Sequence, residues 1–289
     1  MSVWDQFEPV LVIGATIAVF VAIINSVLHL EKNRKTSRHP LTNGLARFPG
    51  YSLSQQVSDI QLDLMGHLMG LMFVPIVLYA VYLKSASDIG GFIVAVVFVG
   101  CYAYLIRMFM KDRKKLVHHR LGLDCERAVG QELSRVGEHG FYVFHDFPAD
   151  NFNIDHIVVG PTGVFAVETK GRSKPVRGKG AADAKVIFDG KSLQFPINRE
   201  TKPVDQAVAQ AEWLKRWISS AVGEAVGVKP VLVLPGWFVE RTGRGEVVVY
   251  NGKSPDKVFP KLNNQVLDSS IIKRINHQLD QRCRIDIAG

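Results

Sequence analysis

Residues 154–170 read IDHIVVGPTGVFAVETK, and their pattern decides how the second half of the chain folds. Two apolar runs rich in β-branched residues flank Gly160-Pro161-Thr162-Gly163, which has the composition of a tight turn. We therefore expect an antiparallel hairpin that turns at these four residues. Apolar residues fall on both faces of the hairpin, which indicates a covered, central position in a sheet.

Three charged side chains interrupt this apolar hairpin. If the turn lies at 160–163, counting back along both strands places Asp155 opposite Glu168, with their Cβ atoms about 5 Å apart. Alternation along the strands puts Lys170 on the same face as Glu168 and His156 on the other face. The register therefore predicts two carboxylates and one ammonium on one patch, with His156 as a hydrogen-bonded scaffold residue.

Opposed carboxylates in a covered sheet repel each other and are costly to desolvate. A divalent cation removes that cost, and Mg²⁺ binds through one or two carboxylates together with water and substrate phosphate. We expect Asp155 and Glu168 to bind Mg²⁺ (or Mn²⁺), with Lys170 orienting or helping to deprotonate the attacking water. The alternative is a structural salt bridge, in which Lys170 neutralises one acid and no metal is bound.

The pattern around the hairpin is that of a globular α/β domain. Helical periodicity at 122–140 and 201–222 alternates with strand-like runs, among them 141–147, 229–236 and 246–252. Mixed strands between helices predict an α/β sandwich around a central sheet.

These residues resemble the NERD (nuclease-related) domain of the PD-(D/E)xK nuclease superfamily. The resemblance covers about residues 122–240 and lies in three blocks: C-E-R-A-V-G, N-I-D-H-I…E-T-K-G and P-V-D-Q-A-V-A-Q. It implies a restriction-endonuclease-like α/β domain, with a central mixed β-sheet flanked by helices. It also implies metal-dependent hydrolysis of DNA or RNA.

Carried over residue by residue, the resemblance implies a role for five side chains. Asp155 matches the metal-binding aspartate, and Glu168 and Lys170 match the acid and the lysine of the E-x-K motif. Glu126 matches an acid of the first helix, which completes the metal site or bonds to a metal-bound water. Gln206 matches a glutamine that orients water or a phosphate.

A basic loop follows the hairpin closely. It supplies candidate phosphate contacts at Arg172, Lys174, Arg177 and Lys179. The alternative is a solvated flexible loop. His145 and Asp146 end a strand near the site and can support it, although a polar pair at a strand end is the commoner explanation.

The first 110 residues are dominated by apolar runs at about 10–30, 64–83 and 89–110. Each run has about the length that a helix needs to cross a bilayer. We therefore expect three transmembrane helices, the alternative being buried helices of a soluble protein. Residues 111–121 are expected to form a basic juxtamembrane linker, and 122–289 the nuclease-like domain.

Basic residues flank the first and third runs, and they predict the orientation of the chain. The expected arrangement is a multi-pass protein of the inner (cell) membrane, with its N-terminus outside and its C-terminal domain in the cytoplasm. A net charge of +8 and a pI near 9.4 favour anionic partners, either nucleic acid or a lipid surface. Three scattered cysteines without a CxxC pair argue against a disulfide framework and against a structural zinc site.

Together these features predict a membrane-anchored, metal-dependent nuclease. Two alternatives stay open at this stage: a non-catalytic nucleic-acid-binding module, and a protein-interaction module on a membrane anchor. DNA or RNA as substrate, endo- or exonuclease action and oligomeric state are not decided by the sequence.

Overall fold

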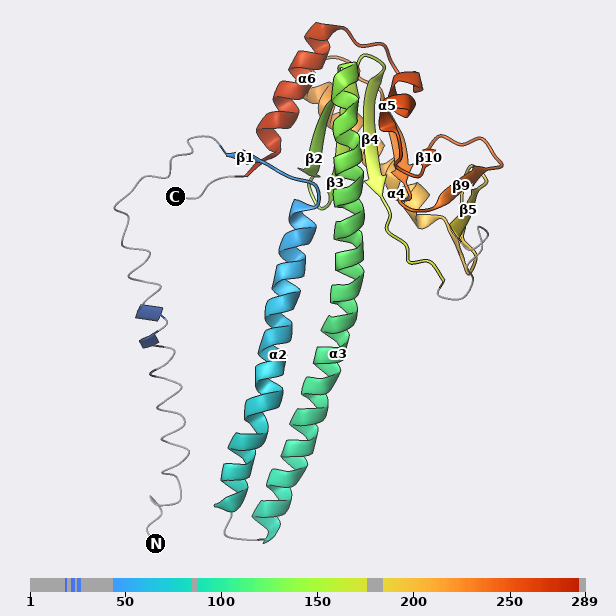
Figure 1. The fold of residues 1–289 in the computed structure, drawn as a ribbon. Coiled ribbons are helices and arrows are strands. Elements are labelled where there is room, and N and C mark those ends of the chain that lie inside the picture. Colours follow the sequence, from blue (N-terminus) through green and yellow to red (C-terminus); the bar gives the residue numbers. More distant parts are fainter. Residues whose placement is uncertain are drawn as a thin grey trace. The chain divides into compact units, whose positions relative to one another are not determined.

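The structure is a computed structural model that describes residues 44–84, 88–175 and 184–285, and a few isolated residues between Val19 and Ser26 (Figure 1). The chain divides into two compact units. One comprises residues 1–42 and 58–117. The other, which we call the sheet domain, comprises residues 43–57 and 118–288.

Two long helices dominate the N-terminal half of the described chain: α2 (Tyr51–Leu83) and α3 (Asp88–Leu133). Both are long and apolar enough to cross a membrane. The described residues therefore hold two such helices and not the three that we expected, since most of the run at 10–30 lies outside them.

Residues 111–121, which we expected to link the apolar region to the nuclease-like domain, are helical. They continue α3 without a break, because they contain neither glycine nor proline and include several good helix formers. After Leu133 the chain passes through a short 3₁₀ helix, η1 (Ser134–His139). This helix ends at Gly140, which has a left-handed φ of 77°. The sheet domain accordingly begins within α3, four residues before the predicted boundary at 122.

The sheet domain is built on a five-stranded mixed sheet with strand order β10-β8-β4-β3-β2. The strands β2, β3 and β4 are antiparallel neighbours, whereas β8 and β10 run parallel to β4. The five strands are β2 (Tyr142–Pro148), β3 (Asn153–Gly160), β4 (Gly163–Thr169), β8 (Val228–Val233) and β10 (Val248–Tyr250). All seven residues of β4 are buried, as expected for a central strand.

Helices cover both faces of this sheet. On one face, α4 (Lys202–Val222) and α6 (Ser269–Arg282) pack against the strands through a continuous apolar cluster. On the other face, the end of α3 packs with Phe259, which begins the short helix η3 (Phe259–Lys261) after α5 (Pro255–Val258). The predicted arrangement of a mixed sheet between helices is confirmed.

The described part of the domain also contains two smaller sheets. One has the order β7-β6-β5-β9, with bounds Arg199–Glu200, Leu193–Gln194, Lys185–Phe188 and Phe238–Arg241. The other pairs β1 (Leu45–Ala46) with β11 (Arg284–Ile285). The second pairing brings a segment from before α2 into the sheet domain, which the sequence analysis did not foresee.

Candidate active site

The hairpin of β3 and β4 has the predicted register. Gly160 pairs with Gly163, and the pairs continue in step to His156 and Val167. Asp155 and Glu168 occupy the next position of this register, at the open end of the ladder. There the backbone N–H of Thr169 donates to Asp155 Oδ2 over 2.6 Å, so a carboxylate takes the place of a backbone acceptor.

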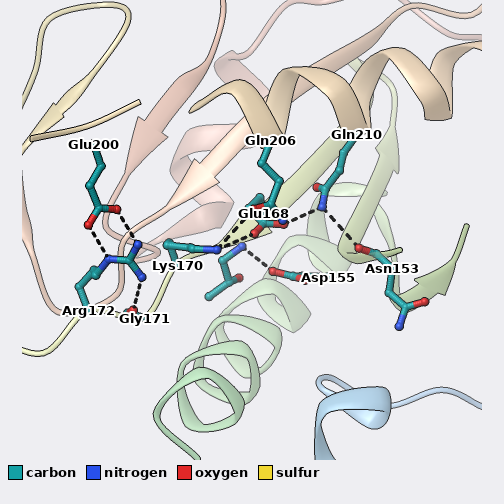
Figure 2. Close-up of polar contacts among 10 residues, drawn as sticks. Asn153, Asp155, Glu168, Lys170, Gly171, Arg172, Glu200, Gln206 and Gln210 are labelled. Atoms are coloured by element: carbon teal, nitrogen blue, oxygen red, sulfur yellow. Dashed lines mark hydrogen bonds and ion pairs between the residues drawn. The ribbon is translucent and has the colours of Figure 1, made fainter. Parts of the chain in front are cut away.

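Glu168 lies at the centre of a polar cluster although it is only 3% exposed. Its Oε2 accepts a hydrogen bond from Gln210 Nε2 at 2.8 Å, and its Oε1 lies 3.6 Å from Lys170 Nζ. Lys170 Nζ also donates to Gln206 Oε1 over 3.4 Å (Figure 2). The two glutamines stand one turn apart on α4, so the helix that covers the sheet also closes this end of the hairpin.

Burial and mutual repulsion raise the pKa values of the carboxylates. Burial, together with the smaller effects of the Glu168 and Asp146 charges, raises the pKa of Glu126 to about 8. Burial also holds the pKa of Asp155 well above its ordinary value, with contributions from Glu168 and Glu126 that exceed the lowering by the Thr169 N–H. The pKa of Glu168 is raised by burial too, although Lys170 and Gln210 counteract part of that rise. The acids therefore lie within electrostatic reach of one another and lack sufficient positive charge.

Hard carboxylate oxygens that lie close together suit Mg²⁺ or Mn²⁺. Within the described ranges, no three acidic, histidine or cysteine side chains are grouped to enclose a metal ion by themselves. Mg²⁺ does not need such a cage, because it keeps several waters and completes its shell with substrate phosphate. Asp155 and Glu168 therefore fit as its protein ligands, with Glu126 nearby on α3.

Asp146 is a further acid at the site, and its partners could not be foreseen from the sequence. It lies inside β2 and not at a strand end, is 4% exposed, and has a left-handed φ of 49°. Arg47 Nη1 donates to its Oδ2 over 2.9 Å, and Ser52 Oγ donates to the same oxygen over 2.7 Å. The two partners come from about a hundred residues earlier in the chain, where no local pattern points to Asp146.

Gln210 is a site residue that was not predicted from the sequence. The resemblance pointed to Gln206, which is exposed and contacts Lys170, whereas Gln210 is buried and holds Glu168. The sequence feature that could have pointed to Gln210 is its spacing of four residues from Gln206 within P-V-D-Q-A-V-A-Q, which puts both amides on one helix face.

His156 is fully buried and lies beside His145, with 2.9 Å between their Nδ1 atoms. Burial lowers the pKa of His145 to about 4 and that of His156 well below its ordinary value, so both rings are neutral at pH 7. One neutral ring donates to the other, which agrees with the predicted scaffold role of His156.

Two of the four residues predicted to contact phosphate, Arg172 and Lys174, lie in the part of the chain that the structure describes. Arg172 forms a two-pronged ion pair with Glu200, at 3.2 Å for Nε–Oε1 and 2.5 Å for Nη2–Oε2 (Figure 2). Its guanidinium is thus engaged within the protein and does not point freely to a ligand. Lys174 is exposed, and Arg177 and Lys179 lie outside the described residues.

Part of the sheet domain matches a known protein family. Residues 121–235 match the family described as NERD, the nuclease-related domain. An uncharacterised protein of Bacillus anthracis is 36% identical over 109 residues, which is 35% of this chain and 50% of that protein. The chain thus spans about half the length of that relative. No solved structure matches the chain.

Proposed function

We propose that this protein is a metal-dependent nuclease that hydrolyses phosphodiester bonds of DNA or RNA. The observation that carries the proposal is the meeting of Asp155, Glu168, Glu126 and Lys170 at the open end of one hairpin. All four lie within the residues that match the nuclease-related domain. A structural salt bridge explains the contact of Lys170 with Glu168, but not why two further acids, Asp155 and Glu126, lie within electrostatic reach of Glu168.

In this proposal Asp155 and Glu168 hold Mg²⁺ or Mn²⁺, and Glu126 binds the cation or one of its waters. When bound, the cation supplies Lewis-acid stabilisation of the charge that develops on the phosphate. The Gln210 amide fixes the carboxylate plane of Glu168, and the Thr169 N–H fixes that of Asp155. Both acids therefore present their ligand oxygens without reorganisation.

Lys170 is the residue best placed to act on the attacking water. Its ammonium has three N–H donors, of which Gln206 takes one and Glu168 a second. The third donor is available for a water or a non-bridging phosphate oxygen. Gln206 is exposed, so its amide can bind the same water or phosphate from the other side.

We propose further that the domain acts at a membrane. The most apolar stretch of α2 contains no buried residue, and only 6% of that of α3 is buried, which differs from the core helices of soluble proteins. Basic residues follow this stretch of α3 at Lys111, Arg113, Lys114 and Lys115. By the positive-inside rule they support a sheet domain on the cytoplasmic side of an inner membrane, with the N-terminus outside. A protease-sensitive tag at the C-terminus should then be reached only from the cytoplasmic side.

The direct test of the activity uses the full chain in detergent with single- and double-stranded DNA and RNA. Cleavage should need Mg²⁺ or Mn²⁺ and stop on chelation. Loss of cleavage in Lys170→Ala, with the fold retained, would support the assignment. Cleavage that persists in excess chelator would contradict it.

A further inference from the structure

Residues 44–57 belong to the sheet domain although they lie far outside the range that matches the nuclease-related domain. Leu45 pairs with Ile285 in the β1–β11 ladder, and the Arg47 N–H donates to the Cys283 carbonyl over 2.9 Å. Arg284 Nη1 donates to the Gly44 carbonyl over 2.9 Å. The segment is thus fixed to the end of the domain at several points.

From this anchored segment, Arg47 reaches the candidate active site. It binds Asp146 twice, through Nη1 to Oδ2 at 2.9 Å and to the backbone carbonyl at 3.2 Å. Its guanidinium also lies 5.2 Å from the centre of the Tyr51 ring. Because Arg47 binds both the side chain and the backbone of Asp146, it fixes the orientation of the whole Asp146 residue.

The residue that Arg47 binds, Asp146, has a strained backbone conformation. A non-glycine residue with φ of 49° in the middle of a strand is costly, and it persists only where its surroundings hold it. The β2–β3 ladder pairs His145 with His156 and resumes at Phe147 with Ile154, so it skips Asp146 and Asp155. The left-handed residue therefore stands opposite Asp155, where it sets the local course of both strands.

At this point in β3 the side chains stop alternating regularly between the two faces of the sheet. Ile154 and Ile157 are three residues apart, yet both pack into the same apolar cluster, which strict alternation does not allow. The break lies at Asp155, between these two residues. The direction of the Asp155 side chain thus depends on the conformation that Arg47 stabilises at Asp146.

A second contact connects the same segment with the site. Gly50 has φ of 71°, and a Cβ there would lie 2.6 Å from a Leu123 methyl carbon and 3.3 Å from Glu126 Oε2. The backbone of the segment therefore rests directly on α3 beside the acid of that helix. Two acids of the site, Asp146 and Glu126, are thus bordered by residues 47–52.

We propose that Arg47 is a positioning residue of the nuclease site, acting through Asp146 to hold Asp155 in the orientation that binds the metal ion. This inference rests on the proposed function. It means that a working site needs the segment ahead of α2 as well as the matched domain. The start of α2 is then coupled to the metal site through Ser52, which binds the same oxygen of Asp146.

The test compares the full chain in detergent as wild type, Arg47→Ala and Arg47→Lys. The matched control is Arg274→Ala, which removes an arginine that binds one carboxylate, Glu224, and one carbonyl, Val222, away from the site. We expect Arg47→Ala to raise the Mn²⁺ concentration for half-maximal cleavage roughly 10–100-fold, as for partners of metal ligands elsewhere. Arg47→Lys should recover part of this loss, and Arg274→Ala should behave as wild type.

A double-mutant cycle separates positioning from a merely structural role. In Asp146→Asn, the further change Arg47→Ala should raise the required Mn²⁺ much less than it does in wild type, because the partner through which it acts has changed. Equal fold-changes in both backgrounds, or wild-type metal dependence in Arg47→Ala, would overturn the inference and leave the nuclease proposal standing.

The Mn²⁺-induced rise in melting temperature provides a readout that does not depend on cleavage. If wild type is stabilised by Mn²⁺ but cuts no substrate, the nuclease proposal fails. A smaller Mn²⁺-induced shift in Arg47→Ala would still support the positioning role. If Mn²⁺ stabilises neither protein and neither cuts, both proposals are wrong.

Discussion

Gln210 donates its side-chain amide to Glu168 Oε2 over 2.8 Å, inside the interface between α4 and the central sheet. The same amide nitrogen lies 3.4 Å from the carbonyl oxygen of Asn153 at the start of β3. One buried side chain thus connects three elements at the point where β3 and β4 present their acids. Helix α4 is therefore both a layer of the core and a support of the site.

Replacing Gln210 with alanine should destabilise the protein and impair metal binding. The change leaves a buried carboxylate without its amide partner, which costs about 1–3 kcal/mol. Melting of the metal-free protein should shift to lower temperature, and more Mn²⁺ should be needed for stabilisation. Gln206→Ala is the control on the same helix, and its exposed side chain should leave the melting temperature unchanged.

Stability of the metal-free protein should fall as pH rises from about 6.5 to 8. Glu126 has its pKa raised from 4.5 to about 8 on folding, so the folded state binds more protons in this window and stability is lost as they dissociate. The histidines act in the opposite direction, since the pKa of His145 falls from 6.5 to about 4 on folding, but most of their effect on stability occurs below pH 6.5.

Melting temperatures over this pH range, with and without Mn²⁺, check that sign. The cation should restore stability most at the alkaline end, because it binds the deprotonated carboxylates. Glu126→Gln should flatten the metal-free curve. A metal-free melting temperature that climbs steadily from pH 6.5 to 8 would refute the proposed cause.

Lys170→Ala should separate chemistry from metal binding. We expect the cleavage rate at saturating Mn²⁺ to fall roughly 100-fold or more, because the ammonium that orients water is lost. The Mn²⁺-induced melting shift should persist, since neither proposed ligand is removed. If cleavage stays at the wild-type rate, Lys170 has only the structural role of neutralising Glu168.

Arg172→Ala tests whether the arginine after the hairpin contacts phosphate. Its guanidinium is held by Glu200, so we expect the salt dependence of nucleic-acid binding to stay the same. A reduction of the slope by about one unit would instead show that a phosphate contact had been lost. Binding is measured by titration at several salt concentrations in chelator, so that no substrate is cut.

Local patterns predicted the hairpin and its register correctly. The turn at 160–163 is bounded by glycines, and the apolar alternation on both sides leaves one register that buries β4. The nearness of Lys170 to Glu168 follows from alternation, because the two residues are two positions apart on one extended segment. The helix at 202–222 was predicted equally well, because Pro203 lies in its first turn and its apolar stripe is regular.

The features that sequence could not predict depend on contacts between distant residues. Arg47 and Asp146 are 99 positions apart, and the pairing of Leu45 with Ile285 spans nearly the whole chain. The continuity of α3 through 111–121 was missed for a different reason. A dense run of basic residues was interpreted as a topological signal, although its residues also favour a helix.

The central claim is that Asp155 and Glu168 bind a metal ion that supports nucleic-acid cleavage. It is tested most directly by titrating Mn²⁺ into wild type and Glu168→Gln, read by calorimetry and by cleavage of DNA and RNA. We predict that wild type binds Mn²⁺ and cuts at least one substrate, while Glu168→Gln, which keeps the shape of the side chain, does neither. Equal Mn²⁺ affinity and equal cleavage in the two proteins would contradict the claim.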